Sequence, residues 1–350
     1  MNVDYIIVGC GLAGIAFAET CIQNGKSIVV FNDESQTSSL VAAGLYNPVI
    51  LKRFSQVWHA SEQINLIDDF YSKLELKLSS EFEFKIPIFR KFFSVEDVNN
   101  WFEATDTPKV GEFLSSEIIN LENESIYAPF GVGKVLQTGF VDTSLLVSKY
   151  IDYLRNENLY INETFEYFEL IQHELGVSYK AINAKHIVFA EGFGNNRNPF
   201  FNYLPVDGTK GELLLIRAPN LRLSEIINSS IYLIPIGNDL YKVGATYNWE
   251  DKTNIPTEIG KAELLLNLRK LISCGFEIIE HRAGVRPTVK DRRPLVGTHS
   301  KFKNFHILNG LGTRGVMLAP ELASILFNNI ENDLPLDEYV DIKRFEKLLK

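Results

Sequence analysis

A glycine pattern near the start of the chain constrains the fold more than any other feature. Residues 5–8 form an apolar run typical of a buried parallel strand, and they lead into Gly9-Cys10-Gly11-Leu12-Ala13-Gly14. In this G-x-G-x-x-G arrangement Gly9 permits a tight turn and Gly11 lets backbone approach a pyrophosphate, while Gly14 lets a helix pack closely on the strand. A helical stretch at 15–21 and a β-branched strand at 27–31 complete a βαβ unit. We therefore predict a dinucleotide site at the N-terminus of this helix.

Two neighbouring residues, Asn32 and Asp33, are candidates for binding the adenosine ribose. The position where an acidic residue is expected after the second strand holds Asn32, and Asp33 follows it. Asn32 can bond a ribose hydroxyl, and Asp33 can take its place through a shifted turn. The alternative is that both belong to a solvated turn.

Composition limits the class of protein. A chain of 350 residues suggests two domains, and 45% hydrophobic with 23% charged residues are typical of a soluble globular protein. The net charge of −9 argues against a general nucleic-acid surface, because phosphate binding depends on Lys and Arg. No run of about 18 apolar residues is present, and no basic leader precedes the first apolar stretch, so we expect neither a membrane span nor a signal peptide.

Cysteine and histidine spacing gives two further expectations. Cys10, Cys21 and Cys274 have neither metal-ligand nor C-x-x-C spacing, which fits a reducing cytoplasm. The six histidines include no H-x-x-x-H pair, so we expect no metal site. Trp58 and His59 are interpreted as structural residues.

Along the chain, helical and strand patterns alternate. Helices are predicted over 56–78, 142–156, 261–273 and 316–330. Residues 79–137 and 208–283 are predicted to be β-rich, with strands at 211–217, 230–236 and 240–246. Strands are also expected at 160–169, 177–182, 185–190 and 305–308. The strand at 185–190 is interpreted as a further strand of the first sheet. It leads into a turn at Gly192.

Two segments near the C-terminal end of the chain are unusually rich in arginine or in glycine. Residues 282–297 contain four arginines within twelve positions, which is too dense for a typical strand. The segment is interpreted as a solvated charged loop, or as one in which Arg286 pairs with Asp291. The functional alternative is that Arg286 directs its planar guanidinium at a carboxylate. Residues 309–315 place three glycines before a helix, which predicts a second anion-binding turn.

These motifs together resemble those of one family. Residues 8–14, 41–45, 187–194, 232–246, 284–297 and 310–320 are similar in order and spacing to the D-amino-acid oxidase (glycine/sarcosine oxidase) family of FAD-dependent oxidoreductases. Gly284-Val285-Arg286-Pro287 resembles the glycine oxidase segment. Gly310-Leu311-Gly312-Thr313-Arg314-Gly315 is more similar to the FAD domain of the bifunctional tRNA methylaminomethyl-uridine synthesis enzyme.

The resemblance implies a fold. The expected class is α/β, with α+β character in the second domain: a Rossmann-like FAD-binding domain and a mixed-sheet substrate domain. Residues 1–80, 138–207 and 284–350 are expected to form the discontinuous FAD-binding domain. Residues 81–137 and 208–283 are expected to form the substrate-binding domain, which agrees with the two β-rich segments.

The resemblance also implies site residues. Arg286 matches the arginine that binds a substrate carboxylate, Tyr232 matches a substrate-side tyrosine, and Arg314 matches the tRNA-enzyme pattern, so its role is open. The expected cofactor is non-covalent FAD, although attachment at His59 is an open alternative. The residues expected to contact FAD are Gly9, Gly11, Leu12, Ala13, Gly14, Asn32 or Asp33, Ser39, Ala43, Gly44, Phe165, Ala190, Gly192, Gly312, Thr313, Arg314, Gly315, Val316 and Met317.

The implied reaction is oxidation of the C–N bond of a small amine or amino acid, glycine-like or sarcosine-like, by hydride transfer to flavin N5. The electron acceptor is O2 or another, unknown acceptor. The first alternative is FAD-dependent removal of an N-carboxymethyl group from a modified tRNA wobble uridine. The second is a flavoprotein without catalysis that serves as a binding module.

Overall fold

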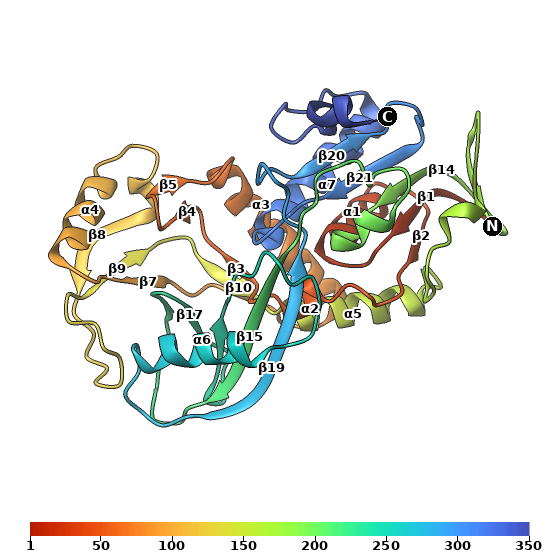
Figure 1. Cartoon of the computed structure of the whole chain (residues 1–350). Coiled ribbons are helices and arrows are strands. Elements are labelled where there is room, and N and C mark those ends of the chain that lie inside the picture. Colours follow the sequence, from red (N-terminus) through yellow and green to blue (C-terminus); the bar gives the residue numbers. More distant parts are fainter. Residues whose placement is uncertain (350) are drawn as a thin grey trace.

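The computed structural model describes residues 1–349, which form two lobes, each built on a large sheet (Figure 1). The first sheet has a parallel centre in which β2 (Ile28–Phe31), β1 (Asn2–Val8), β14 (Ile182–Phe189) and β21 (Phe305–Asn309) lie side by side. It is extended by β11 (Tyr160–Ile161), by the antiparallel strands β12 (Leu170–His173) and β13 (Gly176–Tyr179), and by β20 (Leu295–Thr298). This is the α/β class that the sequence predicts.

Both faces of the first sheet are buried, as a parallel sheet requires. Tyr5 and Ile7 of β1 point into a core shared with α1 (Leu12–Gln23), α3 (Ala60–Leu78), α5 (Thr143–Asn156) and α7 (Gly315–Asn332). Ile6 and Val8 point to the opposite face, where they pack with Phe189 and the irregular segment 192–206. The alternation of side chains along β1 therefore divides them between two cores.

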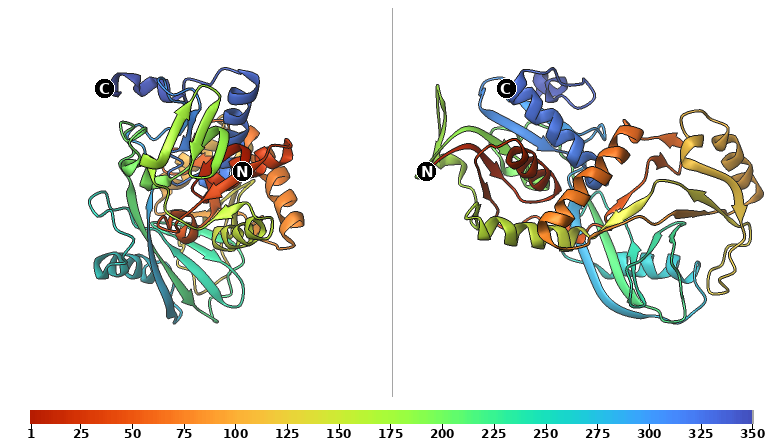
Figure 2. Two further views of the ribbon diagram at one scale, coloured as in Figure 1. Left: turned by 90° about the vertical axis from the view of Figure 1, so that its right-hand side faces the viewer. Right: turned by 180° about the vertical axis from the view of Figure 1, so that it is seen from behind.

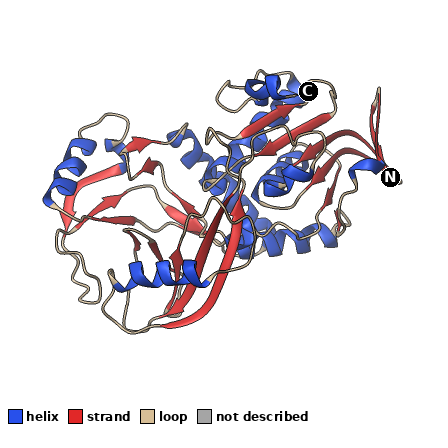
Figure 3. Ribbon diagram, in the orientation of Figure 1, coloured by secondary structure: helices blue, strands red, loops and turns tan. Residues whose placement is uncertain are grey.

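The second sheet is largely antiparallel and forms the other lobe. Its order is β19 (Glu277–Arg286), β15 (Thr209–Arg217), β18 (Leu240–Gly244), β17 (Tyr232–Pro235), β16 (Ile226–Asn228), β7 (Ile88–Lys91), β9 (Val132–Val135) and β8 (Leu114–Ile119). Helix α6 (Glu258–Arg269) packs Leu264 and Leu268 on one face of this sheet, and α4 (Val95–Thr105) lies beside β8 (Figure 3).

Short elements join the two lobes. Strands β3 (Leu45–Tyr46), β10 (Gly139–Val141) and β6 (Glu83–Phe84) form a small sheet, and β4 (Val49–Ile50) pairs with β5 (Ser55–Gln56). Helix α2 (Ser38–Val41) lies against α5 and β19. Figure 2 shows the long strands β15 and β19 running from the second lobe to the first, with both chain ends on the first lobe. The proposed boundary between residues 283 and 284 falls within β19.

Most predicted elements are present, with four main differences. The strand predicted over 177–182 is divided between β13 and β14 by a turn at Lys180. The helix predicted from residue 56 begins at Ala60, because His59 has a left-handed backbone with φ of 50°. The strand predicted over 160–169 is limited to β11, since Phe165 turns into the core and the Glu166 amide donates to the Tyr179 hydroxyl at 3.0 Å. The arginine-rich segment is expected to be too dense for a strand, but β19 runs through both Arg282 and Arg286.

No helix within residues 1–349 is long and apolar enough to cross a membrane. The three cysteines are free, and no cluster of potential metal-ligating side chains occurs among the described residues.

Candidate active site

A large cavity lies between the two sheets. Its volume is about 1120 Å³. One end is lined by the carboxyl ends of β1, β2 and β14 together with the start of α1, and the other by strands of the second sheet. The N-terminus of α7 also faces it. Ligands of open parallel sheets bind outside the carboxyl ends of the strands, so the first end is suited to a nucleotide.

Glycines let the backbone close around the nucleotide end. Gly9 has φ of +102°, and a β-carbon on it would lie 2.4 Å from the carbonyl oxygen of Ala190. A β-carbon on Gly14 would lie 1.9 Å from the Gly9 carbonyl oxygen, so Gly14 brings α1 against the strand and lies beneath the cavity wall. The Ser39 hydroxyl accepts a hydrogen bond from the Leu12 amide at 3.2 Å. The start of α1 therefore presents backbone N–H groups and a positive dipole end to the cavity.

Asn32 and Asp33 both line the cavity and are already hydrogen-bonded. Asn32 Oδ1 accepts from the Cys10 amide at 3.3 Å, and its Nδ2 donates to the Tyr160 hydroxyl at 3.0 Å. Asp33 accepts from the Ser35 amide at 3.0 Å and from the Thr164 hydroxyl at 3.2 Å. Burial raises the pKa of Asp33, but these hydrogen bonds outweigh it and leave that pKa below its usual value. Asp33 is thus ionised at the end of β2, and its carboxylate can accept hydrogen bonds from a ligand in the cavity.

A third acidic residue, which the sequence did not single out, lies against the glycine turn. Glu191 accepts hydrogen bonds from the Tyr167 hydroxyl and from Asn198 Nδ2, the latter at 2.7 Å. Burial raises the pKa of Glu191 to about 7 despite these two bonds. A β-carbon on Gly9 would lie 3.4 Å from the Glu191 Cα, so the backbone of Glu191 lies against the glycine turn, and Glu191 also lines the cavity.

The turn before α7 forms another wall of the cavity. Gly312 has φ of +55° and its amide donates to the Pro287 carbonyl at 3.2 Å, which ties this turn to the segment after β19. Arg314 is the residue that precedes the first turn of α7, and it lines the cavity. Burial lowers the pKa of Arg314, although the nearby phenols of Tyr339, Tyr247 and Tyr232 oppose that change. An arginine nonetheless keeps its charge at neutral pH.

At the other end, Arg286 reaches across β15. Its Nη1 donates to the Thr246 carbonyl at 3.2 Å, and its guanidinium carbon lies 4.5 Å from the ring centre of Tyr247. A β-carbon on Gly211 would lie 2.0 Å from Nη2, so the glycine makes the space that the guanidinium occupies. The alternative pairing with Asp291 is wrong, because Asp291 accepts from Arg344 at 2.9 Å.

Tyr232 lies on β17 in the middle of this wall. Its neighbours across the sheet are Asn228 on β16 and Gly244 on β18, and all three line the cavity. Burial raises the pKa of Tyr232 to about 12. The phenol is therefore neutral and can donate a hydrogen bond at physiological pH.

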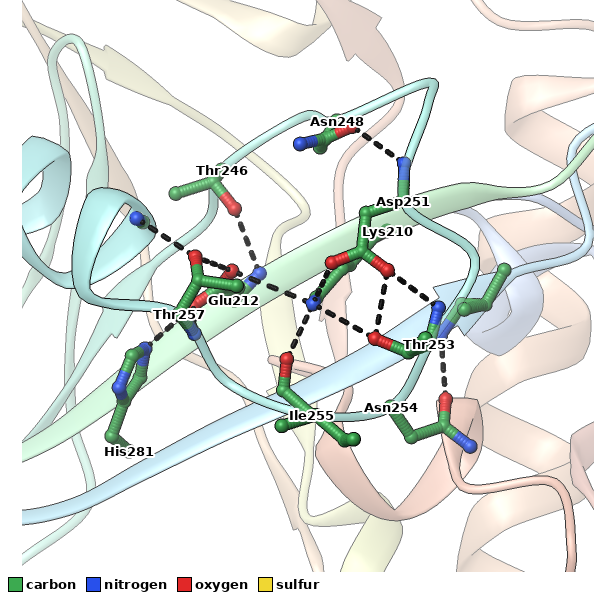
Figure 4. Close-up of polar contacts among 12 residues, drawn as sticks. Lys210, Glu212, Thr246, Asn248, Asp251, Thr253, Asn254, Ile255, Thr257 and His281 are labelled. Atoms are coloured by element: carbon green, nitrogen blue, oxygen red, sulfur yellow. Dashed lines mark hydrogen bonds and ion pairs between the residues drawn. The ribbon is translucent and has the colours of Figure 1, made fainter.

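A buried polar network holds the loop that carries Tyr247 (Figure 4). Lys210 is fully buried, and its ammonium contacts the Asp251 carboxylate, the Thr253 hydroxyl and the Ile255 carbonyl. Glu212 accepts from the Thr257 amide at 2.9 Å and lies 2.8 Å from His281 Nε2. These contacts fix the loop between β18 and α6 against β15.

All the predicted site residues except Gly14 line this one cavity, although its walls come from distant parts of the chain. His59 lies elsewhere: it stacks on Trp58 and its Nδ1 lies 2.6 Å from Glu321 Oε1. Sequence reasoning missed Arg90, Gly211, Tyr247, Asn228 and Glu191. The one available signal was an arginine directly after the apolar pair Ile88 and Phe89, in the segment 79–137 that is predicted to be β-rich.

Fold and cavity together define a two-lobed α/β protein in which the carboxyl ends of a parallel sheet, which suit a nucleotide, open onto a wall formed by a second sheet. The chain belongs to the DAO family, described as "FAD dependent oxidoreductase": the sequence model of this family matches residues 4–328. It is therefore an FAD-dependent oxidoreductase.

Individual relatives are distant. Glycine oxidase of Bacillus subtilis is 22% identical over 262 residues, covering 70% of this chain and 69% of its own. The bifunctional tRNA 5-methylaminomethyl-2-thiouridine biosynthesis protein of Idiomarina loihiensis is 26% identical over 41% of this chain, which is 25% of that protein.

Two solved structures share the fold over nearly the whole chain. Glycine oxidase from Geobacillus kaustophilus has a TM-score of 0.79 at 17% identity, covering 98% of both chains. Iminodiacetate oxidase from Chelativorans sp. BNC1 has a TM-score of 0.80 at 17% identity, covering 96% of this chain and 98% of its own.

The cavity fits FAD by its own chemistry. The absence of β-carbons at Gly9 and Gly14 lets the strand, the turn and the start of α1 pack closely, which leaves the N-terminus of α1 facing the cavity. The Arg155 and Arg197 side chains line the same end and supply positive charge. The N-terminus of α7 offers a second positive dipole end farther along the cavity.

Proposed function

We propose that this enzyme oxidises the C–N bond of a small amine or amino acid that carries a carboxylate. The observation that supports this proposal is Arg286: its guanidinium faces the cavity beside Tyr247, and none of the acidic side chains in residues 1–349 forms an ion pair with it. A guanidinium fork suits a carboxylate because it donates two parallel hydrogen bonds. The glycine oxidase likeness supports the same substrate class.

The residues proposed to hold FAD follow the cavity from one end to the other. We place the pyrophosphate at Gly9, Gly11 and the start of α1. We assign the ribose to Asp33, because an ionised carboxylate can accept further hydrogen bonds, whereas both polar atoms of the Asn32 amide are engaged. Ser39, Ala43 and Gly44 line the middle, and residues 312–317 border the flavin end. Bound there, FAD supplies the acceptor for a hydride from the carbon beside the substrate nitrogen. None of these contacts requires a covalent bond, and His59 lies away from the cavity.

The chain's own residues orient the substrate rather than transfer its protons. Arg286 binds the carboxylate, and Tyr247 stacks on the guanidinium and holds it in place. The neutral phenol of Tyr232 donates a hydrogen bond from the sheet wall. Such a reaction depends on orientation, so the site needs no His–Asp acid–base pair.

The division of the chain follows from the same arrangement. We propose that residues 1–80, 138–207 and 284–350 bind the cofactor and that residues 81–137 and 208–283 bind the substrate. The first sheet and its helices supply the glycine turns, and the second sheet supplies Tyr232 and the space for Arg286.

The experiment that tests this function is an anaerobic visible spectrum of purified protein with a panel of amines. Bleaching by N-alkyl glycines or amino acids, and not by the matching amines without a carboxylate, supports the proposal. A flavin spectrum that no carboxylated amine bleaches contradicts it. Reoxidation in air then tests whether O2 serves as the electron acceptor.

A second candidate is removal of an N-carboxymethyl group from a modified tRNA uridine. The likeness to the tRNA-modifying protein favours it, as do exposed Lys290, Arg292 and Arg293 beside the turn after β19. A gel shift with tRNA separates the two candidates, because specific binding through phosphates weakens steeply with salt.

A further inference from the structure

Besides Arg286 and Arg314, another guanidinium group lines the cavity and forms no ion pair with an acidic side chain of residues 1–349. Arg90 lies on β7 and lines the same cavity as Arg286 and Tyr232. Its Nε is buried and has no hydrogen-bond partner. The ion pairs formed by arginines within residues 1–349 involve Arg155, Arg217, Arg282 and Arg344, and not Arg90. Arg90 is partly buried and the charge of Asp97 acts on it, but no acidic side chain of the described residues pairs with it and its buried Nε has no acceptor. Leaving a buried donor unsatisfied is costly, so the position of Arg90 points to an anion supplied by a ligand.

The register of the second sheet places Arg90 on the same rung as Tyr232. Arg90 pairs with Asn228 on β16, and Asn228 pairs with Tyr232 on β17. Neighbouring strands lie about 4.8 Å apart, so the Cα atoms of Arg90 and Tyr232 are separated by roughly 10 Å. Residues paired across strands point to the same face of a sheet, which is here the face that lines the cavity.

Arg286 approaches Tyr232 from the opposite direction. It starts on β19, crosses β15 above Gly211 and donates to the Thr246 carbonyl just beyond β18. The two guanidinium groups therefore lie on either side of Tyr232. A ligand whose carboxylate binds Arg286 would extend past the phenol of Tyr232 toward Arg90.

The cofactor does not account for Arg90. Arg155 and Arg197, which contact Glu34 and Ser35, lie at the nucleotide end, whereas Arg90 belongs to the opposite sheet. The nearest aromatic contact of Arg90 is the half-exposed Phe93 ring, 5.4 Å from its guanidinium carbon. That contact covers one face of the guanidinium and satisfies none of its N–H groups.

We propose that the preferred substrate is an amine with two carboxylates, one bound by Arg286 and the other by Arg90. This inference rests on the proposed function and assigns Arg90 as the residue that determines specificity. Arg90 offers the planar fork that suits a carboxylate, and Asn228 beside it can donate a further hydrogen bond.

The test compares three substrates in the holoenzyme: N-(carboxymethyl)glycine, its uncharged analogue N-(carbamoylmethyl)glycine, and N-methylglycine. The measured quantity is the concentration that half-saturates anaerobic flavin reduction. We expect the wild type to half-saturate with the dicarboxylate at a concentration at least tenfold below that for the amide. Arg90→Gln should abolish this difference and change the value for N-methylglycine less than twofold. Arg217→Gln, an exposed arginine on β15, is the control and should retain the wild-type preference.

Each other outcome is informative. An equal loss with all three substrates in Arg90→Gln would show that Arg90 only supports the site, and a wild type without preference for the dicarboxylate would also overturn the inference. If no amine reduces the bound flavin, the proposed oxidation is wrong. In that case, the change in the flavin absorbance spectrum on adding the dicarboxylate is measured in the wild type and in Arg90→Gln. An equal change in both proteins overturns the inference, and a loss of the change in the variant supports it.

Discussion

The guanidinium of Arg286 occupies the space directly above Gly211, where a β-carbon would lie 2.0 Å from Nη2 and 2.3 Å from Cζ. These residues are on adjacent antiparallel strands, with Gly211 paired to Gly284 and Thr209 paired to Arg286. The absence of a side chain at 211 thus determines where the guanidinium lies. Gly211 therefore shapes the wall of the cavity although it has no functional group.

Gly211→Ala should therefore displace Arg286. We expect KM for a carboxylated amine to rise about tenfold, equivalent to ~1.4 kcal/mol, with FAD content unchanged. Steady-state kinetics and the flavin absorbance of the purified variant measure both quantities. Gly275→Ala is the matched control, because a β-carbon added at Gly275 would have nothing within 4 Å of it. Wild-type KM in Gly211→Ala would show that Arg286 does not bind the carboxylate from this position.

Arg286→Lys should weaken substrate binding while preserving the positive charge. A lysine ammonium loses the two parallel hydrogen bonds of the fork, and we expect a 10- to 100-fold rise in KM, ~1.4 to 3 kcal/mol. Arg282→Lys serves as control, since Arg282 lies on the same strand and pairs with Glu280. Unchanged kinetics in Arg286→Lys would remove Arg286 from the site.

Glu191 should make FAD binding depend on pH. Its pKa is raised by burial from 4.5 to about 7, so the folded chain holds a proton that the unfolded chain has released. Stability of the apoprotein should fall as pH rises from about 4.5 to 7, because ionising Glu191 costs free energy in the folded state. The ionised carboxylate also repels the FAD diphosphate, so the Kd for FAD should increase between pH 6 and 8.

The variants Glu191→Gln and Glu174→Gln separate this effect from general titration. Other charged groups near Glu191 are Arg197 and Asp33, and both remain in each variant. Glu191→Gln should flatten the pH dependence of the Kd for FAD, as measured by quenching of flavin fluorescence, and Glu174→Gln, an exposed position, should retain it. The same slope in Glu191→Gln as in wild type would exclude this residue as its source.

Lys210→Met should loosen the loop that carries Tyr247. The change removes the donor to the Ile255 carbonyl and the partner of Asp251, so we expect a loss of about 1 to 3 kcal/mol of stability. KM should rise several-fold because Tyr247 no longer holds Arg286. Lys252→Met, which alters a lysine of the same loop that pairs with Asp207, should leave KM unchanged. Equal KM values in both variants would show that the loop does not position Arg286.

The nucleotide end of the site could be predicted from sequence because its determinants are local. Gly9, Gly11 and Gly14 act within one βαβ unit, and the structure confirms the strand, turn and helix at those positions. The turn before α7 could be predicted for the same reason, since three glycines precede a helix start within a few residues.

The substrate end could not be predicted to the same extent because it depends on long-range pairing. Arg90 and Tyr232 are 142 positions apart and meet only through the register of β7, β16 and β17. The role of Gly211 follows from its pairing with β19, which no local pattern reveals. The density of arginines near 286 suggests a loop, whereas strand pairing to β15 overrides that local signal.

The central claim, that this flavoenzyme oxidises a carboxylated amine held by Arg286, is tested most directly by anaerobic flavin reduction. Wild-type holoenzyme and Arg286→Lys would be mixed with N-methylglycine and with methylamine, and the flavin absorbance followed. We predict that N-methylglycine bleaches the wild-type flavin, that the variant needs a 10- to 100-fold higher concentration, and that methylamine bleaches neither. Bound flavin that N-methylglycine and the other carboxylated amines leave oxidised, or equal bleaching by methylamine, would contradict this account.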